Sequence, residues 1–283
     1  MRTITAILPV YNEEALVKPC LEHLTPYVDE IVVIDGSPKG PSDDKTAEIA
    51  KSFDKVKYLS GTFKTIPGEW DAGSQKNRGI AEATGDVLLF LSADMFFYNI
   101  QFLCDTIRRE EDIKIFFCLT AEFWMDTEHV RMYATVDNLS LPGFPQEAVA
   151  ISRDSQPIST QHGSLETIAI KPKEQVLVTS AIKYHLGWIR PFEDQVKKHI
   201  QHVNQGRWGE VGANLLSGTE QKLEQWAYLH VASYKTVPSV QLRCALPDEW
   251  DFMKSMTYRD GEDEALKAYT KKWGVGPFRG VRK

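Results

Sequence analysis

Residues 70–94 read W-D-A-G-S-Q-K-N-R-G-I-A-E-A-T-G-D-V-L-L-F-L-S-A-D. Within this stretch, residues 86–91 (D-V-L-L-F-L) are continuously apolar after the first residue and too few for an independent helix. We therefore expect a strand that is covered on both faces, as in parallel α/β sheets. Ligands of such sheets bind just beyond the carboxyl ends of the strands, and Asp94 lies at that position.

The residues before this strand predict a helix. Residues 73–83 alternate small and polar side chains at helical spacing, and Gly85 closes the turn into the strand. Lys76 and Arg78 lie near the helix start, where cations and free backbone N–H groups suit an anion such as a diphosphate. A second interpretation stays open for Asp94, because an aspartate after a buried strand is often only a helix or turn cap.

Composition limits the classes of protein to consider. The chain has 283 residues, enough for one large domain or two small ones, and a net charge of −6. That charge argues against a protein that coats polyanions generally, although a local basic groove stays possible. We find no secretory signal and no apolar run near the roughly 20 residues of a membrane helix. Four scattered cysteines without C-x-x-C spacing favour reduced thiols in a cytoplasmic protein.

The order of elements predicts the fold class. Strands are expected at 3–9, 30–34 and 55–60, with helices between them at 14–24 and from Asp43 or Asp44 to 53. This alternation, continued by residues 73–91, indicates an α/β fold: a doubly wound, mainly parallel mixed sheet with helices on both faces. The second strand also ends on a carboxylate, Asp35, so we expect Asp35 and Asp94 to face one cleft. The glycine-rich turns of Rossmann and P-loop proteins are absent.

Four motifs together resemble a known family. They are P-V-Y-N-E-E at 9–14, I-D-G-S at 34–37, Q-K-N-R-G at 75–79 and G-D-V-L-L-F-L-S-A-D at 85–94. In this order and spacing they resemble the nucleotide-sugar-binding half of family 2 glycosyltransferases, which have the GT-A fold. The resemblance covers roughly the first hundred residues.

The resemblance implies a donor, a metal and their binding residues. The donor would be a nucleoside-diphosphate sugar, and its sugar would pass with inversion to a hydroxyl of a glycan, lipid-linked glycan or protein. Asp94 matches the last aspartate of the family's D-x-D motif, which binds Mn²⁺ or Mg²⁺ and so neutralises the leaving diphosphate. Ser92 replaces the first aspartate, which leaves one carboxylate. The implied nucleotide-binding residues are Pro9, Tyr11, Glu13, Asp35, Ser37, Lys76, Asn77 and Ser92.

The second half of the chain offers candidates for the remaining roles. Residues 182–194 (I-K-Y-H-L-G-W-I-R-P-F-E-D) resemble the tail of related family 2 enzymes, where a histidine after the last strand completes the metal or phosphate site. His185 is that candidate, or else a structural histidine. Inverting transfer needs a base that deprotonates the acceptor hydroxyl. The candidates, each of which could equally be a surface charge or a cap, are Glu166, Asp126, Glu193 and Asp194.

The expected domains are a GT-A domain at 1–190 and a mainly helical extension at 191–283 packed on it. Within the first, 1–98 would bind the nucleotide and 99–190 the acceptor; helices are expected at 193–205 and 219–231. Two other functions stay open. The basic, aromatic C-terminal segment 267–283 suggests glycosylation of a modified nucleic-acid base, and Ser92 suggests a catalytically silent GT-A-like binding protein.

Overall fold

The structure is a computed structural model that describes residues 1–64, 70–123, 129–131, 146–160, 165–167, 175–190, 192–204, 218–233, 239–241 and 271. The chain forms two compact units. The first comprises Met1–Thr120 and Pro145–Tyr184, and the second comprises Ala121–Phe144 and His185–Lys283. The functional division at residue 190 stays a prediction.

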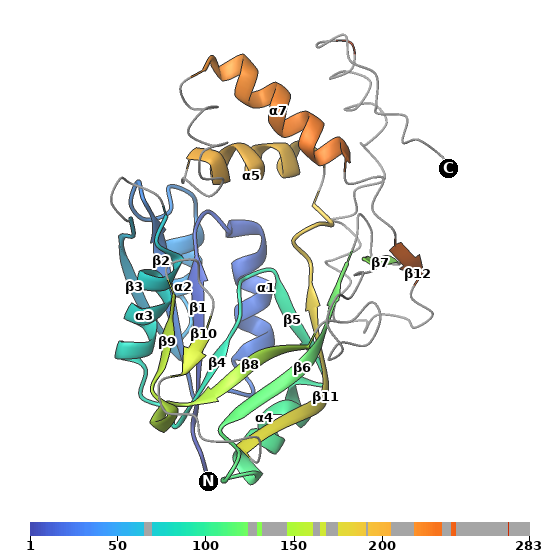
Figure 1. Cartoon of the computed structure of the whole chain (residues 1–283). Helices are drawn as coiled ribbons and strands as arrows, with labels where there is room; N and C mark the ends of the chain where they lie inside the picture. The colour runs from blue at the N-terminus through green and yellow to red at the C-terminus, as the bar shows by residue number, and fades with distance from the viewer. Residues whose placement is uncertain are drawn as a thin grey trace. The chain divides into compact units, whose positions relative to one another are not determined.

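The main feature of the described residues is an eight-stranded sheet in the order β3-β2-β1-β4-β8-β6-β11-β5 (Figure 1). Four neighbouring strands are parallel: β1 (Ile4–Val10), β2 (Glu30–Ser37), β3 (Val56–Thr62) and β4 (Val87–Phe90). β8 (Gln146–Ser152) runs antiparallel to β4 and to β6 (Ile115–Glu122). The remaining strands are β11 (Val176–His185) and β5 (Met95–Tyr98). The predicted mixed, doubly wound sheet is confirmed.

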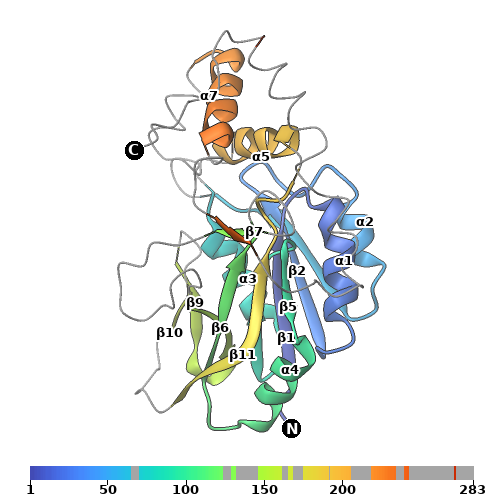
Figure 2. The same cartoon turned by 90° about the vertical axis from the view of Figure 1, so that its right-hand side faces the viewer.

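Helices cover both faces of the parallel strands. α1 (Glu14–Leu24) and α2 (Thr46–Lys51) lie on one face and α3 (Ala72–Glu82) on the other (Figure 2). α1 buries one stripe of side chains, as its sequence periodicity predicts: Leu16, Val17, Cys20, Leu21 and Leu24. α4 (Ile100–Arg109) follows β5 and was not predicted. It begins after Asn99, which has a left-handed backbone (φ 59°) and makes no side-chain cap.

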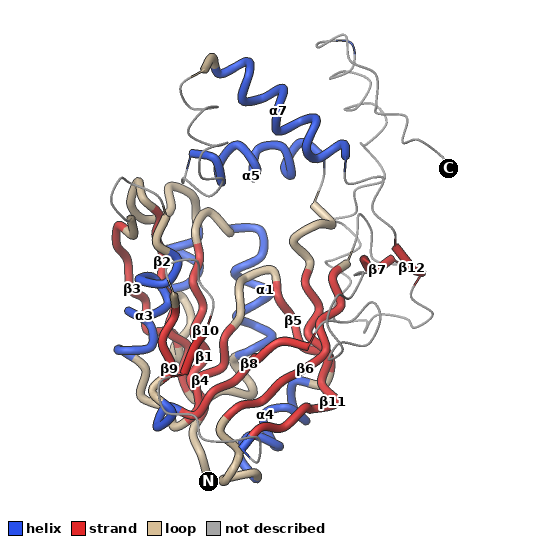
Figure 3. The backbone as a smooth tube through the Cα atoms, in the orientation of Figure 1, coloured by secondary structure: helices blue, strands red, loops and turns tan. Residues whose placement is uncertain are grey.

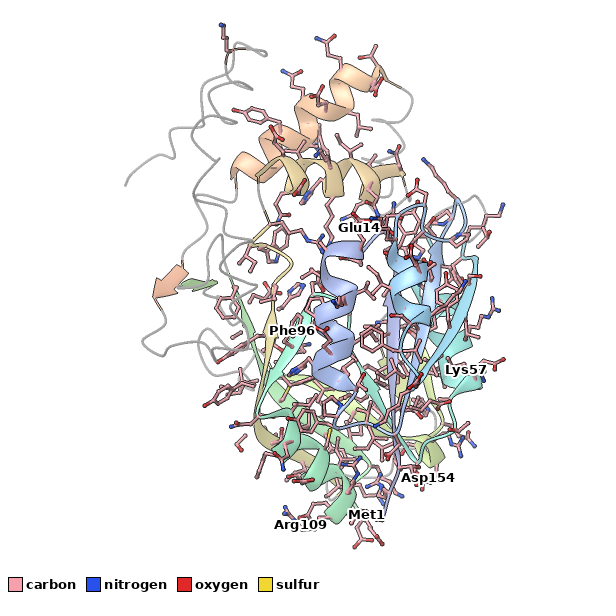
Figure 4. All side chains as sticks on the ribbon, turned by 180° about the vertical axis from the view of Figure 1, so that it is seen from behind. Met1, Glu14, Lys57, Phe96, Arg109 and Asp154 are labelled. Carbon is pink, nitrogen blue, oxygen red and sulfur yellow. The ribbon has the colours of Figure 1, made fainter. Side chains whose placement is uncertain are left out.

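The core between α3 and the sheet is apolar. Its buried members come from β1, β2, β4, β8 and the segments flanking α3: Ile7, Val32, Ile34, Phe63, Ala83, Leu88, Phe90 and Ile151. β5 contributes to the core on the other side, because Phe96 is buried beside α1 (Figure 4). Phe97 is buried as well. Ring contact between Phe96 and His23 (5.4 Å between centroids) joins β5 to α1.

Hydrogen bonds fasten the parallel strands at their amino ends. Thr5 Oγ1 donates to Glu30 Oε2 (2.7 Å) and accepts from the Gly85 N–H (2.8 Å). Glu30 Oε2 also accepts from Thr84 N and Oγ1. Burial opposes the charge of Glu30, yet the bonds from Thr84 and Thr5 lower its pKa below the ordinary value. β1, β2 and the turn into β4 are thus joined at this edge.

Smaller elements complete the two units. In the first, the 3₁₀ helix η1 (Arg153–Ser155) precedes the hairpin of β9 (Pro157–Ser159) and β10 (Leu165–Thr167). In the second, β7 (His129–Arg131) pairs with β12 (Ser239–Gln241). α5 (Phe192–Asn204) packs on α7 (Glu220–Ser233) through Val203 and Leu223. These two helices confirm the helices expected at 193–205 and 219–231, whereas an extension at 191–283 that packs on the first domain stays a prediction.

Candidate active site

The loops after β1, β2 and β4 leave the same edge of the sheet, and Figure 3 traces them in tan. In the parallel register Val10 lies opposite Asp35, and Ile7 lies opposite Phe90. β1 is therefore the central strand, with the chain that carries Asp35 on one side and the chain that carries Asp94 on the other. Figure 4 shows Glu14, which follows β1, at one end of the unit and Met1 and Asp154 at the other.

Asp94 is a buried carboxylate just beyond β4, with 6% of its surface exposed. A turn places it there, because the Met95 N–H donates to the Ser92 carbonyl (3.0 Å). The pKa of the Cys20 thiol on α1 is raised by burial, and then by the charges of Asp94 and Glu13. Both carboxylates therefore lie within electrostatic reach of one thiol. The β1 and β4 loops bring these two acids to the same region.

Asp35 is fully buried, and both of its carboxylate oxygens already accept hydrogen bonds. Ser42 donates to Oδ1 from its backbone N–H (3.0 Å) and from its hydroxyl (2.6 Å). Tyr58 on β3 donates its hydroxyl to Oδ2 (2.6 Å). The pKa of Tyr58 is raised by burial and by this bond to Asp35. Asp35 thus holds the 38–46 loop and β3 to the end of β2.

Ser37 is also fully buried, and it closes a tight turn. Its N–H donates to the Gly40 carbonyl (2.8 Å), and the Gly40 N–H donates back to the Ser37 carbonyl (3.1 Å). Gly40 has φ +119°, a conformation that L side chains rarely adopt. The P-K-G-P residues 38–41 therefore form a self-contained turn, after which Ser42 returns to Asp35.

The loop after β1 is tied to the loop after β2. The Asn12 N–H donates to Ser42 Oγ (2.8 Å), and the Glu13 N–H donates to Thr46 Oγ1 (2.8 Å). Asn12 takes a left-handed backbone (φ 51°), which asparagine tolerates better than most residues. Pro9, Tyr11 and Glu13 are half-buried in this region. Pro9 lies one residue before the end of β1, and Tyr11 and Glu13 belong to a loop whose shape depends on Ser42 and Thr46.

The start of α3 differs from the prediction of an anion site. Asp71 caps the helix, and its carboxylate accepts from Ser74 N (2.8 Å) and Ser74 Oγ (2.7 Å). The helix start therefore already interacts with a negative group of the protein. Lys76 is half-buried on the same helix. Asn77 forms two bonds with the backbone of β9: its Nδ2 donates to the Ser159 carbonyl (2.8 Å), and its Oδ1 accepts from the Ser159 N–H (2.7 Å).

Gln75 reaches from α3 to the carboxyl ends of two strands. It is fully buried, and its Nε2 donates to the carbonyls of Val10 (3.1 Å), Ile34 (2.7 Å) and Gly36 (3.3 Å). Val10 ends β1, and Gly36 lies one residue before the end of β2. This side chain therefore links the origins of both loops described above.

In the second unit His185 pairs with an acid. Its Nδ1 lies 3.4 Å from Glu122 Oε1, and its carbonyl accepts from the Phe123 N–H (3.0 Å). Glu193 and Asp194 are exposed in the first turn of α5, where Asp194 forms an ion pair with Lys197 (3.3 Å). Acids in that position stabilise a helix.

The structure describes only the backbone of one further candidate base and does not describe the other. Asp126 lies outside the described residues. Glu166 lies in β10, opposite Ile158 of β9 in the antiparallel ladder. Because Asn77 holds β9 against α3, the backbone of Glu166 lies one strand away from the helix that carries Gln75 and Lys76.

The model of glycosyl transferase family 2 matches residues 5–147, just over half of the chain. The chain belongs to glycosyl transferase family 2. The matched residues include the parallel strands β1 to β4 and the loops that carry Glu13, Asp35 and Asp94. The family resemblance drawn from the four motifs is confirmed.

Curated relatives of this family 2 protein share its first part. Glucosyl-3-phosphoglycerate synthases of Mycobacterium tuberculosis (strain H37Rv) and Mycolicibacterium smegmatis are each 29% identical over 98 residues, which is 33% of this chain. The matched part is 29% of the first relative and 31% of the second. The match therefore spans less than a third of the length of either relative.

Solved structures with similarity include TarS residues 1–349 of S. aureus, with a TM-score of 0.41, 14% identity, and coverage of 82% of this chain and 71% of that one. Another is glucosyl-3-phosphoglycerate synthase from Mycobacterium tuberculosis in complex with Mn²⁺, UDP-glucose and phosphoglyceric acid. Its TM-score is 0.35, with 22% identity and coverage of 56% of this chain and 60% of that one.

The family resemblance implies a divalent metal, and the residues around Asp94 fit one. Within the described part of the chain, no three His, Cys, Asp or Glu side chains gather closely enough to hold a metal by themselves. Mg²⁺ needs no such cage, because one or two carboxylates and substrate phosphates usually hold it. Asp94, buried at the strand end with Glu13 in the same region, fits that requirement.

None of the described helices has the length and apolar character to cross a membrane.

Sequence reasoning missed the network that orders this family 2 site. Ser42 and Tyr58 hold Asp35, and Gln75 holds the ends of β1 and β2. The Q-K-N-R-G motif contains Gln75, and the spacing of small residues on α3 shows that this face is closely packed. The tyrosine offered no comparable signal, because only the pairing of β2 with β3 brings Tyr58 beside Asp35.

Proposed function

We propose that this protein transfers a sugar from a nucleoside-diphosphate sugar to an acceptor hydroxyl, with inversion and with the help of Mn²⁺ or Mg²⁺. One observation carries the proposal. Asp94 is a buried carboxylate just beyond β4, at the edge where the β1 and β2 loops also begin. In open α/β sheets this edge is where ligands bind.

Asp94 would hold the metal through its carboxylate, with the remaining ligands from the donor phosphates. When bound, such a cation neutralises the charge that grows on the leaving diphosphate. Ser92 stands beside Asp94 in the chain and would contribute a hydroxyl instead of a second carboxylate. The role of His185 stays a prediction, supported by its pairing with Glu122. Metal-bound histidines usually direct their other ring nitrogen at a carboxylate or carbonyl.

The nucleoside would lie against half-buried Pro9 near the end of β1 and against Tyr11 and Glu13 of the loop that follows. Lys76 would offset phosphate charge. Asp35 and Ser37 would act on the pocket by shaping it, because their polar atoms already hold the 38–46 loop. Asn77 would likewise act through β9, to which both ends of its amide are bonded.

Glu166 is our proposed base. It belongs to the same compact unit as Asp94, on the hairpin that Asn77 attaches to α3. Its carboxylate would take the proton of the acceptor hydroxyl as the hydroxyl oxygen attacks C1 of the sugar and the C1–O bond to the diphosphate breaks. The exposed Glu193 and Asp194 are explained by their place at a helix start.

The test is a donor panel with Asp94→Asn and a matched control. UDP-, GDP-, CDP- and dTDP-sugars are assayed for turnover and binding, with and without Mn²⁺, and UDP-glucose is also tried with 3-phosphoglycerate. Asp86→Asn is the control, because Asp86 accepts bonds from Thr3 at the opposite end of the same strand. Asp94→Asn should lower metal-dependent turnover on the order of a thousandfold, since it weakens metal binding. Full activity in Asp94→Asn, or no response of the wild type to any donor, would contradict the proposal.

A further inference from the structure

Gln75 makes contacts that suit a role in ordering the donor site. Its carbonyl acceptors, on Val10, Ile34 and Gly36, belong to the last residues of two neighbouring parallel strands. Beyond them the chain leaves the sheet as the loop that carries Tyr11 and Glu13 and as the turn at Ser37. A single buried side chain on a third element, α3, therefore fixes where both loops begin.

The orientation of the Gln75 amide follows from its surroundings. The reverse orientation would direct the amide oxygen at the same carbonyl oxygens, which is repulsive, so Nε2 must face the strand ends. Oε1 is buried and has no hydrogen-bond partner among the described residues. A buried acceptor without a donor is unfavourable, and such a group in a native protein calls for an explanation. The hydrogen bonds that Nε2 donates supply that explanation.

A glutamine suits this position because it is a neutral double donor. A leucine of similar size would leave the carbonyls of Val10, Ile34 and Gly36 without this donor. A glutamate would replace Nε2 with an oxygen that accepts, unless the carboxyl group is protonated. The site therefore distinguishes an amide from both isosteres.

We propose that Gln75 is a positioning residue for the donor site: through Val10, Ile34 and Gly36 it fixes the spacing of the loop that carries Tyr11 and Glu13 relative to the turn at Ser37. The inference rests on the proposed function, and it deepens that proposal by naming a residue that acts on the donor without being required to touch it. Small displacements of such loops are costly for catalysis, because substrate groups must be held within about an ångström.

The experiment compares Gln75→Leu with Thr5→Val. Thr5 is also fully buried, and its hydroxyl joins the same strands, β1 and β2, at their amino ends. Both variants lose buried hydrogen bonds, but only Gln75→Leu loosens the edge that carries the site. We expect Gln75→Leu to lower kcat/KM for the donor by on the order of tenfold to a hundredfold, mainly through KM. Thr5→Val should keep donor KM within about twofold at a similar loss of thermal stability.

Gln75→Glu adds a readout that a purely structural role would not move. The ionised carboxylate is repelled by the three carbonyls, whereas the protonated form can donate one hydrogen bond. The ratio of kcat/KM for Gln75→Glu to that of the wild type should therefore rise as the pH is lowered from about 8.5 to about 6. A ratio independent of pH, or equal donor KM values for Gln75→Leu and Thr5→Val, would overturn the inference.

Amide hydrogen exchange separates this inference from the proposed function. In Gln75→Leu without donor, exchange should speed up in residues 11–14 and 37–42, and in Thr5→Val it should speed up near residues 28–31 and 84–87. If the wild type uses no donor but this exchange pattern holds, the proposed function fails and the ordering role stands. If exchange in the two loops is unchanged by Gln75→Leu, the ordering role fails whatever the activity.

Discussion

Tyr58 donates its hydroxyl to Asp35 Oδ2 over 2.6 Å, so a residue of the third strand completes the hydrogen bonding of a buried acid on the second. Ser42 occupies the other oxygen. The carboxylate therefore joins β2, β3 and the 38–46 loop. Three hydrogen-bond donors satisfy this buried group.

Tyr58→Phe should lower the free energy of unfolding by about 1–3 kcal/mol, because it leaves a buried carboxylate oxygen without its donor. The phenyl ring keeps its contact with the Lys51 ammonium, which lies 4.5 Å from the ring centroid, so the hydroxyl alone is tested. Urea unfolding measures the change. Tyr27→Phe is the control, because the Tyr27 hydroxyl makes no hydrogen bond to any described residue. Equal stability of the two variants would show that the Tyr58–Asp35 bond contributes nothing net.

His23 predicts how stability depends on pH. Burial lowers its pKa from 6.5 to about 4, and its Nε2 accepts from the Phe97 N–H (3.1 Å). Because the pKa of the folded state is below that of the unfolded state, stability is full above about pH 6.5, falls as the pH drops to about 4 and then levels off. The loss from this group should be about 3 kcal/mol.

His23→Gln is the matched variant, since its side-chain oxygen can still accept from Phe97. Unfolding free energies of both proteins should be measured between about pH 7 and pH 5, above the range in which most carboxylates titrate. The wild type should lose stability in this window more steeply than His23→Gln. Parallel plots of unfolding free energy against pH would mean that the protonation of His23 is not linked to folding.

Gly73→Ala should destabilise the protein, although alanine favours a helix over glycine by about 1 kcal/mol. A methyl group at residue 73 would overlap the carbonyl oxygen of Thr160, because α3 and the end of β9 approach closely there. We expect a net loss of about 1–3 kcal/mol, as for other overpacked sites. Thermal unfolding shows whether the substitution lowers or raises stability. A gain in stability would show that the helix and the hairpin separate easily.

Glu166→Gln should lower kcat by on the order of a hundredfold to ten-thousandfold with little change in donor KM, as expected for loss of a general base. Glu193→Gln and Asp194→Asn, exposed on α5, should stay within about threefold of the wild type. Steady-state kinetics on the donor found in the panel compare the three. If Glu193→Gln or Asp194→Asn loses the activity instead, the base belongs to the second unit.

Local sequence patterns predicted the elements whose periodicity is simple. The stripe of apolar residues at 14–24 matches α1, and the apolar run after Asp86 matches β4. α4 was missed because it starts after Asn99 without a side-chain cap, directly behind the aromatic strand β5. Local signals identify amphipathic segments well but depend on recognisable ends.

The site was predictable in its location and less so in its contacts. The parallel order places Asp35 on β2 and Asp94 just beyond β4, and these two strands flank β1. The sequence could not show that Tyr58 and Ser42 bind both oxygens of Asp35, because these bonds depend on the strand register and on the turn at Gly40. Likewise, the Asn77 amide on α3 bonds to the backbone of β9, a strand that no sequence pattern predicted.

The hydrogen bonds among Thr5, Glu30, Thr84 and Gly85 have a consequence for how such proteins diversify. These bonds join the amino ends of the strands and involve no residue from the carboxyl ends, where the candidate site lies. Side-chain exchanges at the opposite edge leave these bonds in place, so the amino ends of the strands stay joined. Descendants of one ancestral gene can thus come to differ at the edge where ligands bind and still inherit the same sheet.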